Sequence, residues 1–267
     1  MAKKLTALTL ILFIFSQFMT GCDKTVTISG NTSGTPSGSD KAYATETATL
    51  PAEAKGKILN YSFGLYGEPE IGEEIAVMHT SQGDFCIRFF PDAAPLAVTN
   101  FKELATSGYY DGVIFHRIIN DFMIQGGDPT GTGYHGDSFW GNAFNDEFST
   151  DARNFRGALS MANAGANTNG SQFFVVQLDT VTDSLISQMQ QLPSRFSDKV
   201  IDVYRQYGGT PGLDYKHTVF GFVFYGMETV DKIAAVKTGE NDKPLEDVVI
   251  NGIDVVYYGG IANSDAQ

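Results

Sequence analysis

Apolar and polar residues alternate along much of the chain, which is the pattern of half-buried β-strands. The clearest pair of runs, Ile75–Thr80 and Phe85–Phe90, flanks the turn-forming residues Ser81–Asp84 and predicts a β-hairpin. Further β-type runs follow at residues 113–125, 157–162, 172–177, 217–224 and 248–258. Many short strands of this kind are typical of a closed or sandwiched antiparallel sheet, so we predict a mainly β protein.

Two segments have helical spacing instead. Pro95 precedes Val98, Phe101 and Leu104 on one helical face, and a glycine follows where the helix would end. Residues 227–237 show the same kind of pattern. Two helices so far apart do not alternate with the strands, which disfavours a parallel βαβ architecture.

The start of the chain has the layout of a secretion signal. Two lysines precede the apolar stretch Leu5–Phe18, which is too short for a comfortable membrane-spanning helix. The sequence Met19–Cys22 then resembles a bacterial lipobox, whose cysteine receives diacylglycerol, although Met19 stands where leucine is usual. We therefore expect a lipoprotein signal peptide at residues 1–21 and lipid attachment at Cys22. The alternative is an ordinary secretory signal with an incidental cysteine.

The next segments connect this signal to the ordered domain. Residues 22–52 are rich in threonine, serine, glycine and alanine, hold too little apolar surface to offset the entropy of ordering, and are expected to be a flexible tether. Residues 53–72 are ambiguous, because the run Ile58–Tyr66 fits a short strand or an arm packed on the domain. We expect the domain at residues 73–258 and a tail at 259–267.

Composition narrows the class of protein and its partners. The chain has 267 residues, of which 42% are hydrophobic, and its 31 acidic and 18 basic side chains give a formal charge of −13. This composition is globular, and the charge repels nucleic acid and anionic lipid headgroups, so we expect no nucleic acid partner. Membrane contact would then depend on a lipid at Cys22. The other thiol, Cys86, lies in a predicted strand, which indicates a packing role.

Three segments carry a specific family resemblance. They are Phe115–Asp128 (FHRIINDFMIQGGD), Ser160–Phe174 (SMANAGANTNGSQFF) and Leu213–Gly221 (LDYKHTVFG). Together they resemble the signature of the cyclophilins, which are peptidyl-prolyl cis-trans isomerases. The order and spacing agree from Ile75 to Tyr258. The resemblance implies a closed eight-stranded antiparallel barrel capped by two helices.

Rotation about an X-Pro peptide bond calls for a particular set of groups. The barrier is about 20 kcal/mol, because conjugation of the nitrogen lone pair gives the C–N bond partial double-bond character. A pocket that holds the proline ring lowers this barrier when a strong donor is aimed at the prolyl nitrogen, since the donor localises the lone pair and favours the twisted state. No nucleophile is needed.

The resemblance assigns these tasks to residues of this chain. It implies Arg117 as the donor, and a guanidinium suits that task because it is always charged and carries several N–H groups on a rigid fork. The other site residues that it implies are Phe122, Met123, Phe174 and Leu213 around the proline ring, His217 on the pocket wall, Gln125, Asn163 and Gln172 as hydrogen-bonding groups for substrate backbone, and Ala162 beside an adjoining groove.

Each assignment has a simpler competing interpretation. Outside its motif, Arg117 would be interpreted as a surface or ion-paired residue, and the apolar site residues as core. His116 is expected to pack, because neighbours on a strand point to opposite faces. The glycine-rich segment 126–133 invites a phosphate-loop interpretation, but it lacks the following Lys-Ser/Thr and a helix.

The chain departs from the family pattern at two places. Gly212 stands where relatives often carry an aromatic residue, a tryptophan in the forms most sensitive to cyclosporin, which puts cyclosporin binding in doubt. An insertion at about residues 180–210 separates the second and third segments. Its apolar residues predict two short amphipathic helices, one ending before Pro193 and one before Gly208. The insertion would be an extra wall of the site or a neutral surface elaboration.

Two functions compete on this basis. The first is a lipid-anchored, extracytoplasmic prolyl isomerase on a bacterial cell membrane that assists the folding of exported proteins. The second is a module that binds proline-containing or unfolded chains with little catalysis. A hydrolase is disfavoured, because the four histidines show no metal-ligand spacing and no Gly-x-Ser-x-Gly elbow occurs. We predict no metal and no cofactor.

Overall fold

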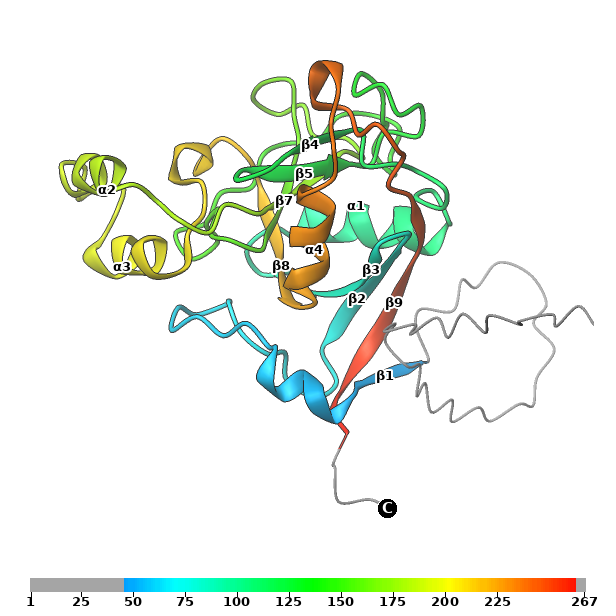
Figure 1. The fold of residues 1–267 in the computed structure, drawn as a ribbon, viewed down its shortest axis with the longest axis horizontal. Helices are drawn as coiled ribbons and strands as arrows, with labels where there is room; N and C mark the ends of the chain where they lie inside the picture. The colour runs from blue at the N-terminus through cyan, green and yellow to red at the C-terminus, as the bar shows by residue number, and fades with distance from the viewer. Residues whose placement is uncertain (1–45, 263–267) are drawn as a thin grey trace, which may run out of the picture.

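The computed structural model describes residues 46–262, and Figure 1 shows how their strands form one sheet. The strand order across this sheet is β1-β9-β2-β3-β8-β6-β7-β5-β4. Its strands are β1 (Thr47–Leu50), β2 (Glu74–Thr80), β3 (Gly83–Phe89), β4 (Arg117–Ile119), β5 (Met123–Gly126), β6 (Ala158–Met161), β7 (Phe173–Val176), β8 (Val219–Tyr225) and β9 (Ile250–Ile261). Strands β2 and β3 form the hairpin that the alternating pattern predicts.

The sheet is antiparallel except at one edge, where β1 pairs parallel with β9. Within the described residues the end strands β1 and β4 are not paired with each other, so the closed eight-stranded barrel is not confirmed. The chain just before β4 does reach the chain before β9, through an isolated bridge between Ile114 and Val249. Strand β4 is three residues long, which leaves little backbone to extend this pairing.

Two helices pack on the sheet and share its main core. They are α1 (Pro95–Thr106) and α4 (Met227–Ala234), which begin where the helical spacing predicts. Phe101 of α1 and Ile233 of α4 are buried in one cluster with Ile124 and Phe173 of the sheet. The residues that the structure describes contain no helix long and apolar enough to cross a membrane.

The ordered domain is longer at both ends than the sequence predicts. Residues 47–50 form strand β1, and Leu50 is buried, so the expected tether at 22–52 is wrong over its last residues. The alternating Thr-Ala-Thr-Leu pattern supports an edge strand there. Strand β9 continues to Ile261, into the expected tail at 259–267. The signal peptide and Cys22 lie outside the described residues.

A second hydrophobic cluster covers the opposite face of the sheet. The arm begins with the 3-10 helix η1 (Ala52–Gly56), and its Tyr61 and Tyr66 are buried in this cluster. The insertion adds α2 (Asp183–Gln190) and α3 (Asp198–Tyr207), which lie side by side at the left of Figure 1. Thr182 and Ser197 cap their N-termini with side-chain oxygens, as the helix-start pattern favours.

Arm and insertion pack directly on each other through aromatic rings. Tyr61 stacks on Tyr207 of α3 with ring centroids 4.0 Å apart. The Tyr61 hydroxyl donates a 2.8 Å hydrogen bond to the carbonyl oxygen of Arg156, next to β6. The ambiguous segment 53–72 is therefore an arm packed on the domain, and Cys86 of β3 is buried in the same cluster.

Candidate functional site

The pairing of three strands places the predicted site residues side by side. Arg117 of β4 is opposite Gln125 of β5, and Gln125 is opposite Phe174 of β7. Directly opposed residues of antiparallel strands point to the same face, and Met123 shares that face because it lies two residues from Gln125. The intervening Ile118, Ile124 and Phe173 point into the main core. The site therefore lies on the face of the sheet that is turned away from this core.

The Arg117 side chain is positioned by a carboxylate. Its Nε lies 3.3 Å from Oδ2 of Asp242, and 42% of the side chain is exposed. Asp242 ends the 3-10 helix η3 (Glu240–Asp242), which contacts β4. An ion pair at Nε does not use the two terminal nitrogens of the guanidinium, which can donate to a second partner. Asp242 cannot be predicted from the sequence, because nothing in a charged surface loop marks it as a neighbour of β4.

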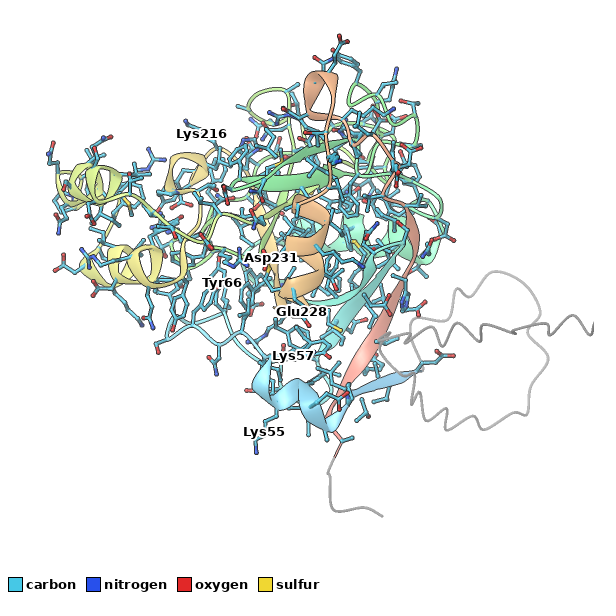
Figure 2. All side chains as sticks on the ribbon, viewed as in Figure 1. Lys55, Lys57, Tyr66, Lys216, Glu228 and Asp231 are labelled. Atoms are coloured by element: carbon cyan, nitrogen blue, oxygen red, sulfur yellow. The ribbon has the colours of Figure 1, made fainter. Side chains whose placement is uncertain are left out.

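A rim loop forms the opposite wall of the site. The 3-10 helix η2 (Pro211–Leu213) carries Leu213, which is half-buried, and His217 follows four residues later. The His217 ring lies against Phe174 at 5.3 Å between centroids and an angle of 87°. Lys216, labelled in Figure 2, belongs to this loop. The structure thus places His217 on Phe174, and Leu213 packs against the hydrophobic cluster that contains Phe174.

Burial favours the neutral form of His217, and a hydrogen bond fixes its ring. Its Nδ1 lies 3.0 Å from the carbonyl oxygen of Met161, which fixes the ring. Burial lowers the pKa of His217, and the hydrogen bond to Met161 opposes this effect without reversing it. A neutral ring that donates from Nδ1 presents Nε2 as an acceptor. This state fits a hydrogen-bonding wall.

Phe122 and Met123 enter the site through the turn between β4 and β5. Asp121 takes a left-handed φ of 58° in this turn. Gln177, which follows β7, braces the turn: its backbone N–H donates to the Phe122 carbonyl oxygen at 2.8 Å, and its Oε1 accepts from the Asp121 N–H at 2.9 Å. Met123 is buried and Phe122 half-buried, so Phe122 is the more accessible of the two.

The predicted polar residues bond to one another and to neighbouring loops. Gln125 Nε2 donates to Gln172 Oε1 at 2.9 Å, and Gln172 Nε2 donates to the carbonyl oxygen of His135 at 2.7 Å. Asn163 Nδ2 donates to the carbonyl oxygen of Lys216 at 2.9 Å and so ties its loop to the rim loop. These residues border, together with Ala162, a cavity of about 430 Å³. That they hold substrate backbone stays a prediction.

Two competing interpretations from the sequence are resolved by the structure. His116 is buried with no hydrogen-bond partner for its ring nitrogens in the described part of the chain, and it packs beside Gly133. In the glycine-rich loop, backbone N–H groups of Thr130 and Gly133 point at the carboxylate of Asp128, at 2.8 and 2.6 Å. Burial raises the pKa of Asp128, but these hydrogen bonds outweigh it and lower the pKa to about 2. The loop already holds its own anion, which leaves these N–H groups unavailable to a phosphate.

Comparison with known proteins decides the family. The family model described as "Cyclophilin type peptidyl-prolyl cis-trans isomerase/CLD" matches residues 75–255. The chain belongs to the cyclophilin family. The cyclophilin is 54% identical over 188 residues to a Staphylococcus aureus (strain USA300) protein named "Putative peptidyl-prolyl cis-trans isomerase", covering 70% of this chain and 94% of that one. A Staphylococcus epidermidis protein of the same name is 52% identical over 193 residues, covering 70% and 97%.

A solved structure agrees with these relatives. The cyclophilin type peptidyl-prolyl cis-trans isomerase of Cryptosporidium parvum, crystallised in the presence of the dipeptide Ala-Pro, superposes with a TM-score of 0.55 at 33% identity. The match covers 68% of this chain and 98% of that one. Family, relatives and fold together show that the cyclophilin described here is a peptidyl-prolyl cis-trans isomerase.

Proposed function

We propose that the cyclophilin catalyses X-Pro rotation with Arg117 as the donor to the prolyl nitrogen. The observation that supports this assignment is the alignment of Arg117, Gln125 and Phe174 across three adjacent strands. The proline ring would lie on the apolar side chains around Phe174, within reach of a guanidinium fixed at Nε by Asp242. As the amide twists, the prolyl nitrogen gains a localised lone pair, and the terminal guanidinium nitrogens donate to it.

The remaining site residues would hold the chain on either side of the bond. The Gln125 side-chain N–H group donates to Gln172. The Gln125 side-chain oxygen would then accept a hydrogen bond from a substrate N–H. His217 offers Nε2 as a neutral acceptor on the pocket wall. Fixed polar groups cost no reorganisation during the twist, so they stabilise the twisted state more than either planar one.

Arg117→Ala and Arg117→Lys variants test the catalytic assignment. Loss of the donor should lower kcat/KM for a short X-Pro peptide by about a hundredfold, the usual effect of removing one transition-state donor. Arg117→Lys keeps the charge but loses the fork, so a partial loss is expected. A control variant, Arg205→Ala, removes an exposed arginine of α3 that pairs with Asp202 and should retain full activity. Full activity in Arg117→Ala would contradict the assignment.

We further propose that this isomerase acts outside the cytoplasm on exported polypeptides, from a diacylglycerol on Cys22. The support is the lipobox-like sequence Met19–Cys22 after an apolar signal. A diacylglycerol supplies two acyl chains, which is what stable anchoring generally takes. Mass spectrometry of the membrane-bound protein should find the lipid on Cys22, and Cys22→Ala should release the protein from membranes. An unmodified Cys22 in a membrane-bound protein would contradict the proposal.

Gly212 favours a second candidate function, the binding of proline-containing or unfolded chains with little catalysis. This residue is exposed on the rim, and a Cβ built there would meet no atom within 4 Å, so the chain has open space beside Gly212 where a larger residue would stand. If the cell needs only binding, the Arg117→Ala variant should complement a strain that lacks the protein as well as the wild type does. If the cell needs catalysis, this variant should fail to complement.

A further inference from the structure

Two exposed aromatic side chains, Phe148 and Tyr215, form a pair beside the isomerase site. Their rings meet edge to face with centroids 6.2 Å apart and planes at 81°. Phe148 is 46% exposed and Tyr215 36%, although both are large apolar rings. Exposed aromatic surface that is continuous with a substrate site indicates a place where an apolar group binds.

A cavity of about 330 Å³ joins this pair to the site. Its lining includes His217 and Asn163 as well as Phe148 and Tyr215. Asn163 also borders the 430 Å³ cavity on the Gln125 side, so the two cavities meet at this residue. A polypeptide held at the Arg117 site and passing Asn163 would therefore have its neighbouring side chains within reach of the aromatic pair.

Tyr215 is fixed in place before any ligand arrives. Its backbone is left-handed, with φ at 59°, a conformation that costs a residue with a side chain about 1 kcal/mol or more. The guanidinium of Arg153 lies over the Tyr215 ring at 4.5 Å and holds it. Arg153 is itself anchored, because its side chain is only 5% exposed and pairs with the buried Asp214 at 3.4 Å. A preorganised ring loses little entropy on binding.

The side chains around the Phe148–Tyr215 pair indicate which kind of ligand would bind there. Phe148 and Tyr215 offer ring faces and edges, and the two charged residues that line the cavity, Asp146 and Lys216, have opposite signs. An aromatic side chain can add a further edge-to-face contact to such a pair. We propose that Phe148 and Tyr215 form a subsite for an aromatic side chain near the isomerised proline and so determine which sequences this cyclophilin prefers. The proposal rests on the isomerase function described above.

A peptide series tests the subsite in the full chain. Each peptide carries one X-Pro bond and a single phenylalanine moved from position to position on both sides of it, and an all-alanine peptide is the reference. We expect one position at which phenylalanine raises kcat/KM about three- to tenfold over alanine. Phe148→Ala and Tyr215→Gly should each abolish this gain and leave the all-alanine peptide unchanged. Glycine tolerates the left-handed backbone at 215, so the second variant keeps the fold.

Phe139→Ala is the matched control. Phe139 is nearly as exposed as Phe148, at 43% against 46%, but lines neither cavity, so its variant should keep the gain from phenylalanine. The proposal is overturned if no position shows a gain, or if the gain survives in both subsite variants. Inactivity of the wild-type chain on the all-alanine peptide would instead contradict the isomerase function itself.

Discussion

The hydroxyl group of Tyr204 in the inserted helix α3 donates a 2.8 Å hydrogen bond to Oδ1 of Asp214 in the rim loop. Asp214 is buried and directly follows Leu213, and its carboxylate also accepts from the backbone N–H of Asn154 at 2.8 Å. Arg195, between the two inserted helices, donates to the Asp214 carbonyl oxygen. The insertion therefore holds the loop that carries Leu213 and His217, which argues against a neutral surface elaboration.

Tyr204→Phe should loosen this loop while leaving the helix in place. Loss of a buried hydrogen bond that stabilises a carboxylate should lower the free energy of unfolding by about 1–2 kcal/mol. We expect KM for an X-Pro peptide to rise about threefold or more, because Leu213 is no longer held against the proline ring. Urea unfolding and steady-state isomerisation assays measure the two effects.

Tyr207→Phe is the control for this prediction. Tyr207 lies in the same helix and packs its ring on Tyr61, so its variant keeps the stacking and should leave KM unchanged. Equal KM values for Tyr204→Phe and the wild type would show that the insertion does not position the rim loop.

Asp242 is predicted to be a positioning residue for Arg117. Asp242→Asn suits the left-handed φ of 59° at this position, so it removes the charge with little backbone strain. We expect kcat to fall about three- to tenfold with KM nearly unchanged, because the guanidinium loses its orientation but the pocket does not change. The ion pair is about half exposed, so added salt should lower wild-type activity toward that of the variant. A variant with wild-type kcat would contradict this role.

His79 should make stability depend on alkaline pH. Hydrogen bonds with Asp254, at 3.1 Å, and Asp84, at 2.9 Å, raise the pKa of His79 from 6.5 to about 9. The folded state therefore binds a proton that the unfolded state releases, so this stabilisation is complete below pH 6.5 and is lost as the pH rises through about 9.

The measurement is urea unfolding of the wild type and of His79→Gln at about pH 6 and about pH 9.5. Because Asp254 is largely exposed and its charge is screened, we expect the wild type to lose only about 1 kcal/mol more than the variant over this range. Parallel pH dependence of the two proteins would contradict the assignment.

Gly212→Trp should restore a missing side of the pocket. A Cβ at this position meets nothing within 4 Å, and Gly212 is exposed, so a side chain can begin there without a backbone clash. We expect cyclosporin affinity to rise about tenfold or more, with isomerase activity retained. Titration calorimetry of both proteins measures the change. Unchanged affinity would place the determinant elsewhere on the rim.

The sequence predicts much of this fold because the local hydrophobic patterns and the three motifs indicate the same mainly β architecture. Alternation gives the β2–β3 hairpin, helical spacing gives α1, α4 and both inserted helices, and the three motifs gather the apolar residues of the site. The ends of the domain do not follow from the local pattern, since a strand such as β1 is stabilised mainly by pairing with β9, and its Thr47 pairs with Tyr257 far along the chain. A local sequence pattern cannot show that β1 pairs with a strand so distant in the sequence.

The polar neighbours of the site could not be predicted for a similar reason. Asp242 and Tyr204 reach Arg117 and Asp214 through tertiary packing, and neither belongs to a motif that names its partner. Tyr215 lies within the third motif, but only the structure shows its left-handed backbone and its contact with Arg153. A sequence pattern does not indicate which non-glycine residue adopts a left-handed backbone conformation.

The most direct test of the account is catalysed cis-to-trans isomerisation of a short X-Pro peptide by the full chain and by its Arg117→Ala variant, with circular dichroism to monitor the fold. We predict that the wild type is active and that the folded variant loses about a hundredfold in kcat/KM. Equal activity of the two folded proteins would contradict the central role of Arg117.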